Sequence, residues 1–101
     1  MRELFWTKHA RDKMRYYNLP ESRVRRVIKS YDRIEEGIAE STIAVMQRTG
    51  SGKREHEIWV MVADRGKQRR VVSAWRYPGK TKAGESLPDE ILREFKEVIL
   101  D

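Results

Sequence analysis

The sequence predicts an α+β protein with two N-terminal helices, an antiparallel sheet of three to four main strands and a C-terminal helix. Near both ends of the chain, apolar residues recur at every third or fourth position, which is typical of amphipathic helices. Between residues 41 and 77 they alternate or run continuously, which is typical of strands. A chain of 101 residues suffices for one hydrophobic core, so we expect a single domain over residues 1–101.

The first helix is expected from Lys8 to Tyr17, after an apolar entry at residues 4–6 that is either an edge strand or a hydrophobic contact onto this helix. Thr7 is a suitable N-cap, because its hydroxyl can accept from an unpaired N–H group of the first turn. Pro20 should end the helix, since it disfavours helical geometry at the residue before it. A second amphipathic helix is then expected from Glu21 to Ser30.

Four segments that follow are strand candidates, of which the first is weak because Gly37 interrupts it; they are Arg33–Ala39, Ser41–Thr49, Glu55–Asp64 and Gln68–Tyr77. The third contains six successive apolar residues, 58–63, so both of its faces should be covered and it should lie centrally in the sheet. Short polar loops between the last three segments predict an antiparallel meander.

The C-terminal segment predicts a final helix that begins at Pro88, a residue suited to a first helical turn. Its apolar residues recur at helical spacing and are expected to face inward: Ile91, Leu92, Phe95, Val98 and Ile99.

The charge of the chain is +6 and unevenly placed. Residues 1–33 hold ten Lys and Arg against four acidic residues, and residues 65–82 hold seven against none. The two basic segments either converge into one phosphate-binding face or are simply solvated. Cysteine is absent, which excludes disulfides and thiolate chemistry, and no apolar run approaches the roughly 18 residues of a membrane span. With no secretory signal pattern either, we expect a cytoplasmic protein with no membrane partner.

His9, Lys13 and Tyr16 form a polar stripe on the first helix, at spacings that place them on one face. A neutral imidazole can act as general acid or base near neutral pH, and Lys13 can bind an anion. The alternative is a structural histidine that bonds to a backbone carbonyl. Asp12 either orients the His9 ring or pairs with a neighbouring arginine.

The strand Gln68–Tyr77 is the second candidate region. Strict alternation would place Arg70, Val72, Ala74 and Arg76 on one face, and Arg69, Val71, Ser73, Trp75 and Tyr77 on the other. Arginine suits the charge on a phosphodiester, and aromatic rings can stack on unpaired bases. Trp75 is either such a platform or part of the core, and Arg48 is a weaker contributor.

A metal or cofactor is not expected. His56 lies between two glutamates, where cross-strand pairing on a solvated face explains it, and two histidines without cysteine make a zinc site improbable. Gly50-Ser51-Gly52-Lys53 lacks the spacing of a phosphate-binding loop and is interpreted as a hairpin loop.

Two stretches resemble a known pattern: His9-Ala10-Arg11-Asp12-Lys13-Met14, continued by Val24, Val27 and Ile28, and Arg70-Val71-Val72-Ser73-Ala74-Trp75-Arg76. The first is similar to H-A-x-x-R-M-x-x-R-G-I-S, the signature of a small domain family that is grouped with RelE- and BrnT-type toxins. The second is similar to the R-I-I-S-A-R strand of BrnT-like toxins. Together with the element order, the resemblance covers most of the chain except the final helix.

The resemblance implies the fold of RelE-like and barnase-like microbial ribonucleases, which cut RNA without a metal by attack of the 2′-hydroxyl on the adjacent phosphate. By position, the resemblance implies that His9, Lys13, Arg70 and Arg76 are catalytic. Substrate binding is expected from five others: Tyr16, Arg48, Arg69, Ser73 and Tyr77. In two departures from the pattern, Lys13 replaces an arginine and loses its bidentate geometry, and Tyr17-Asn18 replaces R-G.

The leading hypothesis is therefore a metal-independent endoribonuclease that acts on RNA, the toxin of a pair whose acidic antitoxin covers the basic face. The alternatives are a non-catalytic RNA- or protein-binding module of the same fold, and a structural domain without a nucleic-acid partner.

Overall fold

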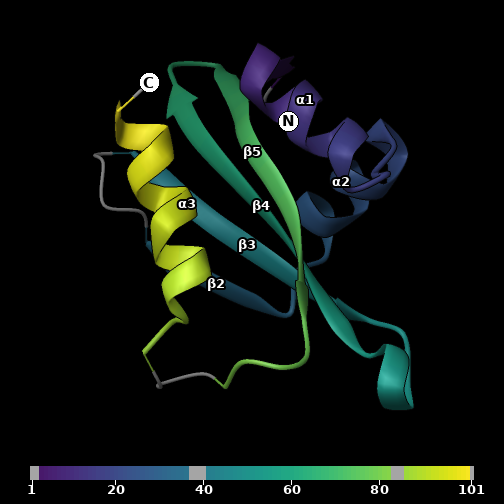
Figure 1. Ribbon diagram of the computed structural model, residues 1–101. Helices are drawn as coiled ribbons and strands as arrows, with labels where there is room; N and C mark the ends of the chain where they lie inside the picture. The colour runs from purple at the N-terminus through teal and green to yellow at the C-terminus, as the bar shows by residue number, and fades with distance from the viewer. Residues whose placement is uncertain (1–2, 37–40, 83–85, 101) are drawn as a thin grey trace.

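The computed structural model describes residues 3–36, 41–82 and 86–100, and within these ranges it contains a five-stranded sheet in the order β1-β5-β4-β3-β2 (Figure 1). The strands are β1 (Glu3–Trp6), β2 (Arg33–Glu36), β3 (Thr42–Thr49), β4 (His56–Arg65) and β5 (Gln68–Pro78). The antiparallel meander β2-β3-β4-β5 confirms the predicted one, with β4 in the centre. Residues 37–39 of the first predicted strand lie outside the described ranges.

β1 corrects the prediction of a purely antiparallel sheet, because it pairs with β5 in parallel and makes the sheet mixed. The apolar entry at residues 4–6 is thus an edge strand. Leu4 and Trp6 pack on the core, whereas Phe5 points to the other face and is exposed. Since the partner strand is far away in the sequence, local pattern gave no sign of this pairing.

The helices are α1 (Lys8–Tyr16), α2 (Glu21–Lys29) and α3 (Asp89–Leu100), and a 3₁₀ turn covers Gly52–Arg54. α1 begins as predicted, since the Thr7 hydroxyl accepts from the Ala10 N–H at 3.1 Å. Each of the first two helices ends one residue earlier than expected, and Asn18 leaves α1 with a φ of 56°. The class α+β is therefore confirmed.

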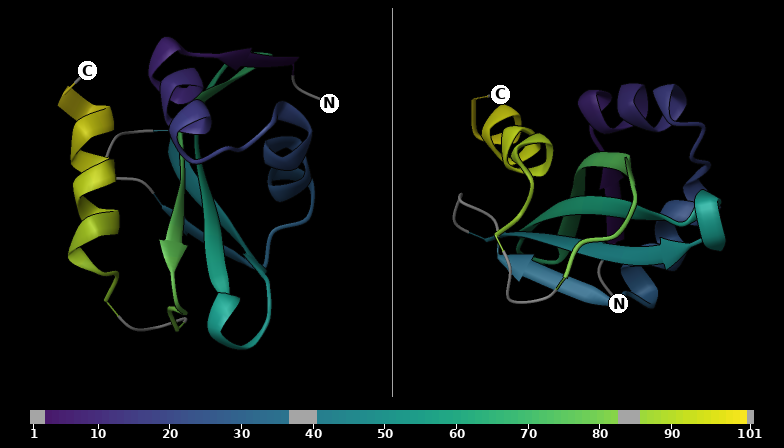
Figure 2. Two further views of the ribbon diagram at one scale, coloured as in Figure 1. Left: turned by 45° about the vertical axis from the view of Figure 1, so that its right-hand side comes forward. Right: turned by 60° about the horizontal axis from the view of Figure 1, so that its bottom comes forward.

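The sheet is covered on both faces: α3 lies on one side, and α1 and α2 cover the other (Figure 2). Among the described residues, eleven are buried in the core on the α1/α2 side: Ala10, Met14, Leu19, Val24, Val27, Val45, Ile58, Val60, Val62, Val71 and Ala74. The core on the α3 side contains Ala44, Met46, Trp59, Met61, Trp75 and Ile91. The continuous apolar run of β4 thus supplies both cores, as predicted from its composition.

A β-bulge in β5 overturns the predicted division of its side chains. Met61 of β4 lies opposite Ser73 and Val62 lies opposite Val71, which leaves Val72 as an extra residue. The extra residue shifts the alternation by one position. Val71 and Ala74 therefore belong to the α1/α2 side, while Val72 packs on the α3 side.

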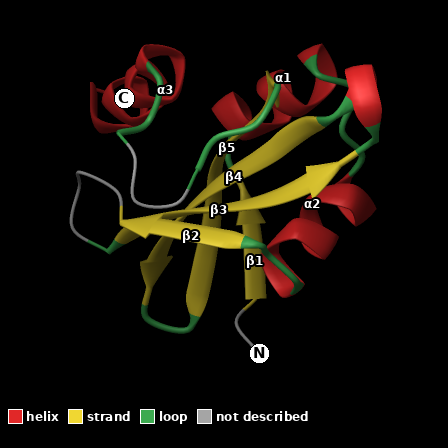
Figure 3. Ribbon diagram, turned by 90° about the horizontal axis from the view of Figure 1, so that it is seen from below, coloured by secondary structure: helices red, strands yellow, loops and turns green. Residues whose placement is uncertain are grey.

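α3 packs against β5 through Ile91, which is buried as predicted. Leu92 was predicted to face inward, but it is 37% exposed, because it follows Ile91 by one position and so points about 100° away from it on the helix. The side chains of Phe95, Val98 and Ile99 lie outside the described part of the structure. Figures 1 and 3 show α1 and α3 on the two sides of β5.

Candidate nucleic-acid interface

Arg76 lies where β5 passes the corner between α1 and α2. Its guanidinium donates to the Tyr17 carbonyl at 2.8 Å and to the Asn18 carbonyl at 3.4 Å. It also lies 2.7 Å from His56 Nε2. Because a guanidinium only donates, His56 Nε2 must accept, and its Nδ1–H donates to the Arg54 carbonyl at 2.8 Å. Arg76 therefore holds the end of α1, and only its remaining N–H groups are available to a ligand.

Arg23 lies close enough to Arg26 and to Arg76 for both charges to act on it. Burial lowers the pKa of Arg23, and the positive charges of Arg26 and Arg76 lower that pKa further. Arg23 donates to the neutral Gln47 side chain, and Arg26 is exposed. The cluster thus concentrates positive charge.

An exposed aromatic ring completes this region. Tyr16 is 80% exposed at the end of α1 and packs edge-on against Tyr17, the residue whose carbonyl Arg76 binds. We call the surface formed by Tyr16, Arg23, Arg26, His56 and Arg76 the corner surface.

Arg70 does not join the corner surface. After the bulge, Arg76 follows Ala74 on the α1/α2 side, whereas Arg70 precedes Val71 and lies on the α3 side. Its guanidinium carbon lies 5.0 Å from the ring centroid of Phe5, and its buried Nε has no hydrogen-bond partner among the described residues. Arg70 and Arg76, which strict alternation predicted on one face of the strand, therefore lie on opposite faces of the sheet.

The other predicted substrate-binding arginines are held by protein groups. Arg69 makes two hydrogen bonds to Asp64, at 2.7 and 3.0 Å, and these raise the pKa of Arg69. Arg48 donates to the Thr81 carbonyl at 3.2 Å. Both therefore stabilise the ends of strands.

Lys13 and Ser73 meet at a carboxylate that sequence analysis missed. The Lys13 ammonium pairs with Glu94 Oε1, and the Ser73 hydroxyl donates to Glu94 Oε2 at 3.0 Å. Glu94 lies three residues after Ile91, on the inward face of α3, so its spacing was a usable signal. These bonds join α1, β5 and α3 and leave Lys13 with a partner other than phosphate.

His9 lies one helical turn before Lys13 and is half-buried, so the predicted stripe on α1 exists. Asp12 bonds to Lys8 at 2.8 Å and pairs with Arg15, which favours the pairing interpretation for this residue. The hydrogen bond from Lys8 lowers the pKa of Asp12 below its ordinary value. The structure thus places His9 and Lys13 together, but apart from the Arg76–His56 pair on the corner surface.

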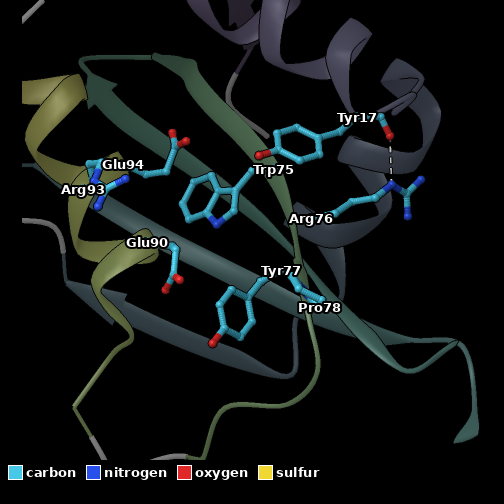
Figure 4. Close-up of a pocket in the computed structure, with 8 residues that line it drawn as sticks. All are labelled: Tyr17, Trp75, Arg76, Tyr77, Pro78, Glu90, Arg93 and Glu94. Atoms are coloured by element: carbon cyan, nitrogen blue, oxygen red, sulfur yellow. Dashed lines mark hydrogen bonds between the residues drawn. The ribbon is translucent and has the colours of Figure 1, made fainter. Parts of the chain in front are cut away.

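A pocket of about 400 Å³ opens between β5 and α3 (Figure 4). It is lined by eight residues: Tyr17, Trp75, Arg76, Tyr77, Pro78, Glu90, Arg93 and Glu94. Tyr77, predicted to bind substrate, lies here, and so does Trp75, which is part of the core and also a pocket wall. Sequence analysis had no signal for this pocket, because it did not pair α3 with β5.

Within the described ranges, no group of three or more histidine, aspartate or glutamate side chains is placed to hold a metal ion. No described helix combines the length and the apolar character needed to cross a membrane. No model of a protein family, curated protein or solved structure matches this chain. Function must therefore be argued from the residues of the corner surface and of the pocket.

Proposed function

We propose that the protein binds single-stranded RNA through the corner surface. The observation that carries this proposal is the convergence of Arg23, Arg26 and Arg76, where the charges acting on the half-buried Arg23 are both positive. Such a cluster attracts a polyanion, and the planar guanidinium matches the geometry of a phosphate.

The exposed ring of Tyr16 favours RNA with unpaired bases over a duplex. Bases splayed out of a single strand stack on aromatic side chains, and each such contact contributes about 1–3 kcal/mol. The Tyr16 ring is 80% exposed and contacts Tyr17, whose carbonyl accepts from Arg76, so a stacking ring is linked through one residue to an arginine of the cluster. The proposal agrees with the resemblance of the sequence to RelE- and BrnT-type toxins, which are RNA-directed proteins.

The test is the affinity for a labelled, mixed-sequence RNA decamer, measured by fluorescence anisotropy at several salt concentrations. We expect Arg26→Glu to weaken binding about tenfold and to make the salt dependence shallower, because a phosphate contact is lost. The matched control is Arg65→Glu, since Arg65 is also exposed but lies at the opposite end of β4 from His56. Equal losses in both variants, or no binding at low salt, would contradict the proposal.

A second candidate function, metal-independent endoribonuclease activity, is favoured by the contact between His56 and Arg76. The Arg76 guanidinium lies 2.7 Å from His56 Nε2 and can stabilise charge on a phosphate. A phosphate that draws Arg76 away would free His56 Nε2, which accepts from Arg76 in the free protein, to accept a proton. We therefore move the proposed catalytic centre from His9 to His56, with Arg76 as its partner. In a toxin pair, an acidic antitoxin would cover the corner surface.

Cleavage of single-stranded RNA in EDTA tests this second candidate. We expect His56→Gln to reduce cleavage at least about 100-fold, the usual contribution of a positioned acid–base group, while His9→Gln retains activity. Products should end in 2′,3′-cyclic phosphate. Loss of cleavage in His9→Gln alone would restore the original assignment, and wild-type protein that binds RNA without cutting it would leave only the binding function.

A further inference from the structure

The pocket between β5 and α3 contains a buried donor without an acceptor. Trp75 is 3% exposed, and its indole Nε1 has no hydrogen-bond partner among the described residues. Leaving a buried N–H unpaired destabilises the folded state, so such groups are rare in folded proteins. Because Trp75 also lines the pocket, a ligand with an acceptor at this position would remove that cost.

The direction of the Trp75 ring is fixed by its neighbours. It stacks on Trp59 with ring centroids 6.0 Å apart and an interplanar angle of 6°. Figure 4 shows the nitrogen on the edge of the ring that faces Glu90 and Tyr77, inside the pocket. The donor is therefore held in one orientation.

Acceptors lie next to this donor. Glu90 is exposed on the first turn of α3, and it makes no hydrogen bond or ion pair with any residue that the structure describes. Its carboxylate can accept two hydrogen bonds at once. Glu94, the other carboxylate of the pocket, is already occupied by Lys13 and Ser73. Glu90 thus offers two carboxylate oxygens as acceptors, and Trp75 offers one N–H donor, on the same side of the pocket.

We propose that this pocket binds an unpaired guanine base. Guanine carries the acceptor O6 beside the donors N1–H and N2–H on one edge, which complements the Trp75 donor and the two oxygens of Glu90. Adenine has an acceptor at N1, so the Glu90 carboxylate would face another acceptor and could not form a hydrogen bond to that atom. The half-exposed Tyr77 ring supplies a stacking surface, and Arg93 on the rim supplies a cation for the phosphate.

The pocket and the corner surface share Arg76, which lines the pocket and whose guanidinium binds His56. The volume of about 400 Å³ is in the range of small-ligand pockets and accommodates a base with its ribose. The guanine can belong to a free nucleotide or to a strand bound at the corner surface. Only the second source rests on the proposed function.

The experiment uses the indole N–H signals of the ¹⁵N-labelled protein, of which there are three, since the chain has three tryptophans. Trp75→Phe assigns the Trp75 signal. We expect GMP to shift this signal in a saturable way, AMP to bind at least about tenfold more weakly, and Glu90→Gln to weaken GMP at least about tenfold, because one charge-assisted contact is lost. The matched control is Glu36→Gln, an exposed glutamate on β2, which should leave GMP affinity unchanged.

Three results would overturn the inference: no shift with GMP, an equal shift with ribose 5-phosphate, or equal affinities for GMP and AMP. Two uridine decamers, one containing a single guanine and one without guanine, then distinguish a free nucleotide from a bound strand as the source of the base. If the guanine belongs to a bound strand, the Trp75 signal should respond to the guanine-containing decamer more strongly than to GMP. Arg26-dependent RNA binding without any response of Trp75 would refute the pocket and leave the corner surface. A response of Trp75 to GMP without any RNA binding would support the pocket and refute RNA binding at the corner surface.

Discussion

Trp59 and Trp75 are cross-strand neighbours whose rings stack on the α3 side of the sheet, yet their surroundings differ. The indole N–H of Trp59 donates to Glu57 at 3.0 Å. Glu57 also accepts from the backbone N–H and the hydroxyl of Thr81, and Arg33 donates to that hydroxyl at 2.8 Å. Every polar group named around Trp59 is therefore bonded within the protein.

The region around Trp75, by contrast, has an unused donor and an open pocket. The two tryptophans contribute similarly to the core, so packing does not explain why only one of them has an acceptor. The hydrogen bonds around Trp59 are thus all made within the protein, whereas the Trp75 N–H is expected to find its acceptor in a ligand. Each of the three predictions below tests this division through the free energy of unfolding, measured by urea denaturation.

The largest effect is expected for Glu57→Ala, which removes the acceptor of Trp59 and Thr81. Three buried donors would be left unpaired, namely the Trp59 indole N–H and the backbone N–H and hydroxyl of Thr81. Each costs about 1–3 kcal/mol, so stability should fall by about 3 kcal/mol or more. The control, Glu90→Ala in the pocket, should change stability by less than about 0.5 kcal/mol, as is usual for exposed positions. A similar loss in both variants would show that the pocket is as much a structural element as the Glu57 cluster.

An intermediate effect is expected for Lys13→Met, because the mostly buried Glu94 would keep its charge without the lysine that balances it. We expect a loss of about 2 kcal/mol, less than for a fully buried pair since both groups retain some contact with water. Lys8→Met breaks the exposed pair with Asp12 on the same helix and should cost less than about 0.5 kcal/mol. Equal costs would mean that Glu94 does not depend on Lys13.

The smallest effect comes from comparing Trp59→Phe with Trp75→Phe. Both changes remove a similar volume, but only the first deprives Glu57 of a donor, so Trp59→Phe should cost about 1 kcal/mol more. If Trp75→Phe is the more destabilising change, its N–H has a partner in the free protein and the proposed role of the pocket is weakened.

The elements of the fold could be predicted where local chemistry marks them. Thr7, Pro20 and Pro88 give recognisable helix starts and stops, and the continuous apolar run of β4 identifies a strand covered on both faces. The pairing of β1 with β5 could not be predicted, because an edge strand of four residues carries no mark of its distant partner.

The candidate site was harder to predict from the sequence, because it too depends on how distant segments pair. The extra residue of the bulge is Val72, and a valine side chain does not predict a bulge. The sequence therefore could not predict the shift in alternation that places Arg70 and Arg76 on opposite faces. The contact of His56 with Arg76 likewise depends on the register of β4 against β5. The sequence therefore indicated Arg76 and Tyr77 as candidate site residues, whereas the neighbours of each required three-dimensional information.

The parallel pairing of β1 with β5 also bears on how the protein is made. β1 is synthesised first, but Glu3 has no partner until Gln68 is added, about 3–13 s later at about 5–20 residues per second. Throughout this interval residues 3–6 lack the strand with which they pair in the folded protein. Unpaired strands readily associate with other chains, so the short length of β1 and its charged first residue protect the protein on the ribosome.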